Sequence, residues 1–73
     1  MERIVEAKQL QIERKSFHLE LRENDRGTFL RITEESPGRR NTIIVPGTGI
    51  DEFATAIGAV ATSGDQPEPP AGS

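Results

Sequence analysis

The sequence predicts an α+β fold in which a four-stranded antiparallel sheet is followed by one helix (ββββα). Apolar and polar residues alternate in four short segments, and turn signals rich in Gly, Asn, Asp or Pro follow the later ones. After the fourth segment, apolar residues recur at helical spacing over residues 49–61. We therefore expect the helix to cover one face of the sheet and to leave the other face open.

The first two strands follow from alternation alone. In residues 8–14, Leu10 and Ile12 share one parity, and the intervening residues are polar. Phe17, Leu19 and Leu21 repeat this pattern in the second strand. Residues 24–27, Asn-Asp-Arg-Gly, then supply the residue types that tolerate the backbone angles of a hairpin turn.

The third strand has two possible core faces, because alternation cannot bury Phe29 together with Leu30 and Ile32. Burying Phe29 would also bury Arg31, and an unpaired buried guanidinium costs far more than an exposed ring. We therefore expect Leu30 and Ile32 to face the helix. Phe29 is then predicted to lie on the open face beside Arg31.

A fourth strand and a helix complete the predicted domain. Residues 41–45 form the strand, with Ile43 and Val45 facing inward, and Pro46-Gly47 ends it. Thr48, with Asp51 three residues later, is typical of a helix N-cap. The predicted helical stripe comprises Ile50, Phe53, Ala54, Ile57, Val60 and Ala61.

The predicted domain organisation has three parts: an N-terminal extension over residues 1–7, the ββββα domain over residues 8–62 and a tail over residues 63–73. The tail is rich in Pro and Gly and lacks large apolar residues, so we expect it to be disordered.

The 73-residue length makes stability a concern, because so small a core seldom supplies more than about 3 to 5 kcal/mol. The chain has no cysteine and only one histidine, His18, and it shows no metal-ligand spacing, so neither disulfides nor a metal is expected. No cofactor is predicted either. Self-association remains, and we expect a homodimer.

Two further functional classes are disfavoured. No apolar stretch approaches the roughly 20 residues that span a bilayer, and no amino-terminal apolar run is found, so we expect a cytoplasmic protein without membrane attachment. No paired carboxylates, activated nucleophile or phosphate-cradling loop can be recognised, so neither an enzymatic activity nor a small-molecule substrate is expected.

The charge is unevenly distributed along the chain. The formal net charge is −3, yet residues 8–40 contain eight Lys or Arg against six acids, a local balance of +2. The predicted open face would carry His18, Glu20, Arg22, Phe29, Arg31, Thr33 and Ile44. Aromatic rings among guanidinium groups stack bases and neutralise phosphates of single strands. The alternative to a binding role is that these arginines are solvated strand residues paired with Glu20 or Glu34.

Residues 8–34, KQLQIERKSFHLELRENDRGTFLRITE, followed by the IDEF helix, resemble the PUR repeat of purine-rich-element-binding proteins. Lys15, Phe17, Leu19, Asn24, Gly27, Phe29, Leu30 and Ile32 match the repeat directly, and Arg22, Arg26 and Arg31 match its basic positions. The resemblance covers residues 8 to about 61. It implies that two repeats intertwine through their helices into a whirly-like unit that binds single-stranded DNA or RNA, so one repeat implies a homodimer.

The resemblance also implies a set of nucleic-acid-binding residues, with purine-rich strands as the preferred partner. Phe29 would stack on a base, Asn24 would contact a base edge, and Arg22 and Arg31 would meet phosphates. The full set is Lys15, Arg22, Asn24, Arg26, Phe29 and Arg31.

Three positions depart from the family pattern. Ser16 and Thr28 replace basic residues and His18 replaces an aromatic residue, while Glu23 adds an anion. Affinity should therefore be lower and more sensitive to salt. The alternative function is a dimerisation or protein-interaction module that has lost nucleic-acid binding.

Overall fold

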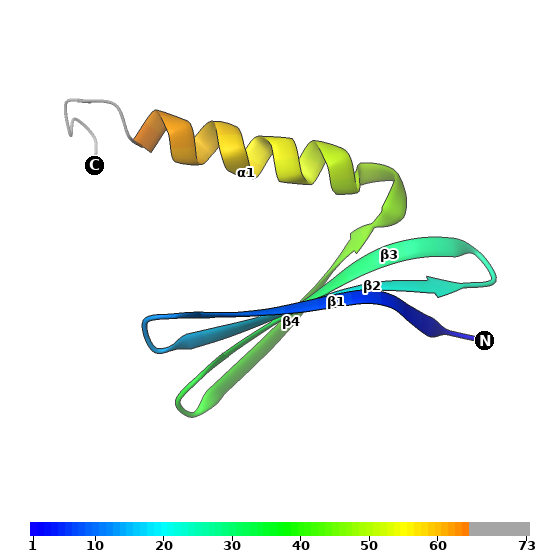
Figure 1. Ribbon diagram of the computed structural model, residues 1–73, viewed down its shortest axis with the longest axis horizontal. Coiled ribbons are helices and arrows are strands. Elements are labelled where there is room, and N and C mark those ends of the chain that lie inside the picture. Colours follow the sequence, from blue (N-terminus) through cyan, green and yellow to red (C-terminus); the bar gives the residue numbers. More distant parts are fainter. Residues whose placement is uncertain (65–73) are drawn as a thin grey trace.

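The computed structural model describes residues 1–64 and confirms the predicted ββββα order (Figure 1). The strands are β1 (Arg3–Ile12), β2 (Lys15–Asn24), β3 (Gly27–Ser36) and β4 (Arg39–Pro46). A 3-10 turn, η1 (Gly47–Gly49), leads into the helix α1 (Ile50–Gly64). The predicted tail lies outside the described residues from residue 65 onward.

The four strands form one antiparallel sheet in the order β1-β2-β3-β4, as expected when each hairpin joins sequential neighbours. The β2–β3 turn places Gly27 at φ 128°, in the left-handed region, and the β3–β4 turn places Gly38 at φ 78°. In the β1–β2 turn Glu13 takes a φ of 55°, which the sequence did not predict.

The register assigns the side chains to two faces. Leu21 pairs with Leu30, and Ile32 pairs with both Leu19 and Ile43, so these residues share one face with Leu10, Phe17 and Val45. We call this the apolar face. Arg22 pairs with Phe29, and Glu20 pairs with Arg31, on the opposite side, which we call the polar face. The predicted orientation of Phe29, away from Leu30 and Ile32, is therefore confirmed.

The first strand is longer than predicted. β1 begins at Arg3 rather than at residue 8, so residues 3–7 pair with β2 and do not precede the sheet. The ladder is interrupted between Ile4 and Glu6 by a bulge. Because a bulge adds one residue to one strand, it reverses the parity beyond it and places Ile4 opposite Arg22 on the polar face.

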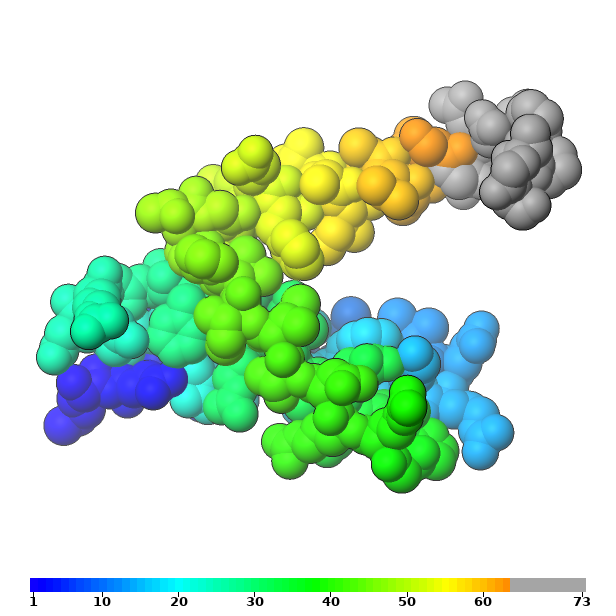
Figure 2. Space-filling model, turned by 180° about the vertical axis from the view of Figure 1, so that it is seen from behind, coloured from blue at the N-terminus to red at the C-terminus, as the bar shows by residue number. Residues whose placement is uncertain are grey.

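The position of α1 differs from the prediction. The first turns of the helix lie near Val45, the one buried large apolar residue in the described part of the chain. Beyond them α1 diverges from the sheet (Figures 1 and 2). Ile57 and Val60 are 56% and 72% exposed, and Leu10 and Ile43 on the apolar face are 45% and 52% exposed. The prediction that the helix covers the sheet is thus wrong for a single chain.

The start of the helix was also predicted one residue too early, and the predicted N-cap lies in a 3-10 turn instead. Thr48 lies inside η1 and is exposed, and α1 begins at Ile50, with Asp51 and Glu52 in its first turn. These acidic side chains suit the positive end of the helix dipole. Thr48 is therefore part of the connection between sheet and helix, where its side chain borders the surface described below.

The 15-residue helix α1 and the rest of residues 1–64 include no segment that is both helical and sufficiently long and apolar to cross a membrane. Within the same residues no group of three or more His, Asp or Glu is arranged to hold a metal ion.

Candidate nucleic-acid interface

Phe29 lies at the end of β3 that adjoins the β2–β3 turn, and its side chain belongs to the polar face. It is half-buried, with Arg22 of β2 and Pro46 of β4 as its cross-strand partners. Opposite residues in an antiparallel pair bring their Cβ atoms to within about 5.5 Å. The ring is thus flanked by a cation on one side and an apolar side chain on the other.

A depression opens beside this ring, and we call it the hairpin-end pocket. Its volume is about 580 Å³. The residues that shape it come from the β2–β3 turn, from β3, from β4 and from η1: Asn24, Arg26, Phe29, Ile44, Pro46 and Thr48. The polar face is therefore hollowed where a flat ligand could contact Phe29.

A second depression, the central pocket, lies further along the polar face and has a volume of about 300 Å³. Thr33, 6% exposed, belongs to its lining, with its hydroxyl 3.4 Å from that of Thr42. The charged and titratable side chains around it are His18, Glu20, Arg22, Arg31, Glu35 and Arg40. Three guanidinium groups thus meet two carboxylates in a small area.

Arg22 is held by two carboxylates. Its Nε donates to Glu20 over 2.9 Å, and its Nη1 donates to Glu2 over 3.0 Å. The hydrogen bond to Glu2, followed by that to Glu20, raises the pKa of the Arg22 guanidinium above its ordinary value. Arg22 therefore stays protonated, but a phosphate must compete with both acids for it.

Arg31 differs from Arg22 in its surroundings. It is half-buried between Glu20 on β2 and Ile44 on β4 in the ladder, and within residues 1–64 it forms no ion pair under 4 Å. Arg40, at the rim, lies 3.7 Å from Glu35, which is also 3.9 Å from His18. Arg31 is thus the cation of the central pocket most available to an added anion.

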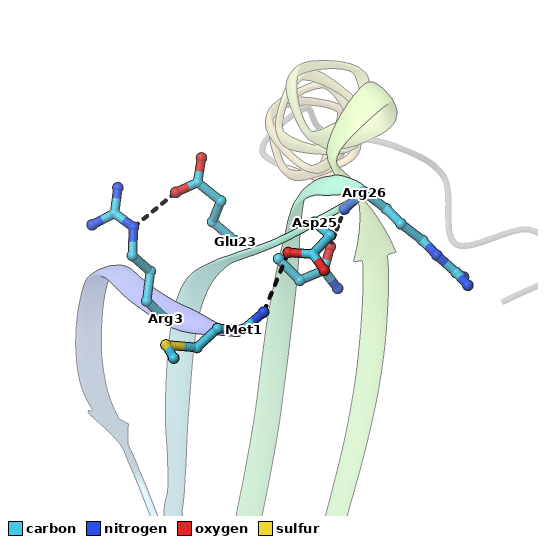
Figure 3. Close-up of polar contacts among 6 residues, drawn as sticks. Met1, Arg3, Glu23, Asp25 and Arg26 are labelled. Carbon is cyan, nitrogen blue, oxygen red and sulfur yellow. Dashed lines mark hydrogen bonds and ion pairs between the residues drawn. The ribbon is translucent and has the colours of Figure 1, made fainter.

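The Asn24 side chain stabilises the β2–β3 turn. Its Oδ1 accepts a hydrogen bond from the backbone N–H of Arg26 over 2.9 Å, as in an Asx turn. Figure 3 shows the Arg26 side chain extending away from Asp25 and the amino terminus, which are joined to each other over 3.2 Å. Arg3 is bonded to Glu23 over 2.8 Å on the far side of the same view. Arg26 therefore reaches solvent beside the hairpin-end pocket.

Lys15 is not brought together with the other predicted residues. By its register it lies on the apolar face, opposite Ile12, and its Nζ is 2.7 Å from Glu34. The hydrogen bonds of Glu34 with Lys15, and then with Asn41, lower the pKa of the Glu34 carboxyl. Lys15 therefore has a structural partner on the face opposite Phe29.

The polar face thus brings together Arg22, Asn24, Phe29 and Arg31, with Arg26 at its margin. The amino-acid sequence that forms this sheet also matches a known family. A family model described as PurA ssDNA and RNA-binding protein matches residues 1–63. The chain belongs to the PurA family of single-stranded DNA- and RNA-binding proteins. This finding confirms the resemblance to the PUR repeat and extends it from residue 8 back to residue 1.

This PurA-family chain is also similar to "Transcription factor Pur-alpha 1" of Arabidopsis thaliana. The two are 49% identical over 47 residues, which is 64% of this chain and 16% of that protein. The chain thus spans only a small part of the length of that relative. The family is described by nucleic-acid binding and not by an enzymatic activity.

Sequence reasoning missed three polar-face residues in this PurA-family chain. Pro46 and Thr48 were assigned only to the end of β4 and the start of the helix, and Glu2 to an extension. The strand register supplies the missing information, because it places Pro46 opposite Phe29. The signal in the sequence was the equal spacing of Phe29 and Pro46 from the turn between β3 and β4, which pairs them once that turn is known.

Proposed function

We propose that this chain binds single-stranded DNA or RNA on the polar face of its sheet, as a homodimer, with purine-rich strands preferred. The observation that supports the proposal best is the placement of Phe29 among Arg22, Arg26 and Arg31, on the face opposite the apolar residues. Stacking of a base on an aromatic ring contributes about 1 to 3 kcal/mol and tolerates any base sequence.

In this proposal Phe29 stacks on a base while Arg31 and Arg22 meet phosphates. Arg31 has no ion pair under 4 Å within residues 1–64 and engages first, whereas Arg22 must exchange Glu2 or Glu20 for the phosphate. Asn24 uses its Oδ1 in the turn, so its amide nitrogen is the group that would contact a base edge. The competition from carboxylates makes binding weaker, and because it removes a phosphate contact it also lowers the salt dependence.

The homodimer is part of the same proposal. The apolar stripe of α1 and the apolar face of the sheet are both exposed in one chain, with Ile57 56% and Ile43 52% exposed. Exposed apolar surface of this extent on a small monomer indicates a site where another protein chain binds. A second copy, with its own helix and apolar face, is complementary to both and leaves the polar faces free.

A fluorescence-polarisation titration with a labelled purine-rich single strand at two salt concentrations tests the binding. We expect Phe29→Ala to weaken binding roughly tenfold, within the range for losing one stacked base. Ile4→Ala, on the same face but outside both pockets, is the matched control and should bind as the wild type does. Equal binding by Phe29→Ala and the wild type would remove the stacking claim.

A second candidate function is favoured by the ion pairs of Arg22. A cation held by two acids suits a module that dimerises or binds another protein without binding nucleic acid. Light scattering and a pull-down distinguish the two functions, because a dimer that binds no oligonucleotide but retains a protein partner supports the second one.

Cytoplasmic residence is proposed for either function, and cell fractionation tests it.

A further inference from the structure

The hairpin-end pocket has walls suited to a nucleobase rather than to a phosphate. Phe29, Ile44 and Pro46 form its apolar sides, with Ile44 53% exposed toward solvent. Of the arginines on the polar face only Arg26 lines it, whereas the central pocket has three guanidinium groups. A base has two apolar faces and a polar edge, while a phosphate needs cations and hydrogen-bond donors all round.

The polar groups of this pocket stand at one end, on the turn and on η1. Thr48 is exposed there, and its hydroxyl can both donate and accept a hydrogen bond. Arg26 borders the pocket from the turn. The pocket volume of about 580 Å³ falls within the roughly 300 to 1,000 Å³ typical of small-ligand sites.

Two contacts fix the shape of the pocket before any ligand arrives. The Asn24 side chain closes the β2–β3 turn on Arg26. Across the pocket, Gly47 packs so tightly on Thr28 that a Cβ at position 47 would overlap the Thr28 carbonyl oxygen and hydroxyl. The start of β3, which carries Phe29, and the segment that contains Pro46 and Thr48 are therefore held against each other, which lowers the entropic cost of binding.

From this geometry we infer that the hairpin-end pocket receives one nucleobase, stacked on Phe29 and bordered by Ile44 and Pro46, and that Thr48 contacts the edge of that base. Discrimination between bases then depends on Ile44 and Pro46 of β4 and on Thr48 of η1. It does not depend on Arg22 of β2 and Arg31 of β3, which meet phosphates. This inference rests on the proposed function and deepens it, because it assigns Ile44, Pro46 and Thr48 a role in base selection.

The test separates base-dependent binding from phosphate-dependent binding. Labelled homo-oligonucleotides of each of the four bases, and a sugar-phosphate chain of equal length without bases, are titrated by fluorescence polarisation. The variants are Ile44→Ser, which removes an apolar wall, and Thr48→Val, which replaces the hydroxyl with a methyl group of similar size. Ile4→Ser is the matched control, because Ile4 is 48% exposed on the same face and lines neither pocket.

We expect the wild type to prefer base-bearing chains over the baseless chain. Ile44→Ser should reduce that preference by about fivefold or more, because it removes an apolar wall beside the stacked base, while affinity for the baseless chain stays unchanged. Thr48→Val should change the ranking of the four bases and leave the baseless chain unaffected. Ile4→Ser should change neither quantity.

Several results would overturn the inference. If Phe29→Ala weakens binding but Ile44→Ser and Thr48→Val keep the wild-type preferences, the proposed function stands and the base pocket does not. If the wild type binds no strand at all, both are wrong. Circular dichroism checks folding, and Thr48→Val, in an exposed turn, decides the matter if Ile44→Ser does not fold.

Discussion

Arg22 donates a hydrogen bond from Nε to Glu20 two residues earlier on the same strand, over 2.9 Å. Its other bonded acid, Glu2, lies 3.0 Å from Nη1, so the cross-strand partner of Phe29 is already engaged by two carboxylates. A single strand of nucleic acid and these acids would compete for the same guanidinium. The acids therefore set how strongly the polar face binds phosphate.

Removing one of these acids should strengthen nucleic-acid binding. In Glu2→Gln the Arg22 guanidinium loses a competing charge, so we expect tighter binding and a salt dependence steeper by about 0.7 in log–log slope, which corresponds to one added phosphate contact. Titrations at several salt concentrations measure this. Glu6→Gln, which removes the same charge on the apolar face of β1, is the control, and an equal gain in both variants would point to net charge alone.

Replacing the ring of Phe29 should affect affinity without affecting the salt dependence. Phe29→Leu keeps an apolar side chain but removes the flat surface, so we expect roughly tenfold weaker binding at every salt concentration. Arg31→Gln should instead lower the slope by about 0.7. The same titrations distinguish the two effects, and a changed slope in Phe29→Leu would contradict a stacking role.

Placing a charge on the apolar stripe of α1 should prevent dimerisation. Ile57 is 56% exposed in one chain, and in the proposed dimer Ile57→Asp would bury an unpaired carboxylate. We expect light scattering to give half the wild-type mass. Ala59→Asp introduces the same charge outside the stripe and should stay dimeric, whereas a wild-type mass of Ile57→Asp would argue against this interface.

The contact between Gly47 and Thr28 should make position 47 intolerant of any side chain. We expect Gly47→Ala to lower the free energy of unfolding by about 1 to 3 kcal/mol, because backbone atoms of the hairpin must move. Gly49→Ala, where a Cβ meets nothing within 4 Å, should change stability little. Urea unfolding measures both variants, and equal stability of the two would contradict the close packing.

Glu34 should contribute to the acid sensitivity of the fold. Its pKa is lowered by Lys15 and then by Asn41, so its contribution is present above the unfolded-state pKa of about 4.3 and is lost as pH falls through the lower folded-state value. Glu34→Gln removes that term. We expect the melting temperature of the variant to fall less than that of the wild type between pH 7 and pH 3.

Thermal melts followed by circular dichroism supply this comparison. Glu23→Gln removes a different ion-paired carboxylate, the one bonded to Arg3, and serves as the control. The assignment would be wrong if Glu34→Gln lost as much melting temperature as the wild type on acidification.

The alternation of residues was sufficient to predict the strands and the outward orientation of Phe29, because a buried Arg31 would cost more than an exposed ring. It was insufficient at residues 3–7, where the bulge between Ile4 and Glu6 breaks the period that defines a strand. Lys15 was grouped with Phe29 by resemblance, although the register places it on the opposite face. Alternation is a local property, and cross-strand pairing is not.

By itself the sequence determined the order of the elements, the two faces of the sheet and the family. The order and the faces depend on the residue-by-residue period of polarity and on turn chemistry, which are local, whereas the family was indicated by the match of residues 8 to about 61 to the PUR repeat. Only the tertiary structure decided that α1 diverges from the sheet, that Glu2 reaches Arg22, and that Pro46 and Thr48 border a pocket beside Phe29. Those relationships join residues from separate strands and turns, so they depend on strand register and on the path of the chain after β4.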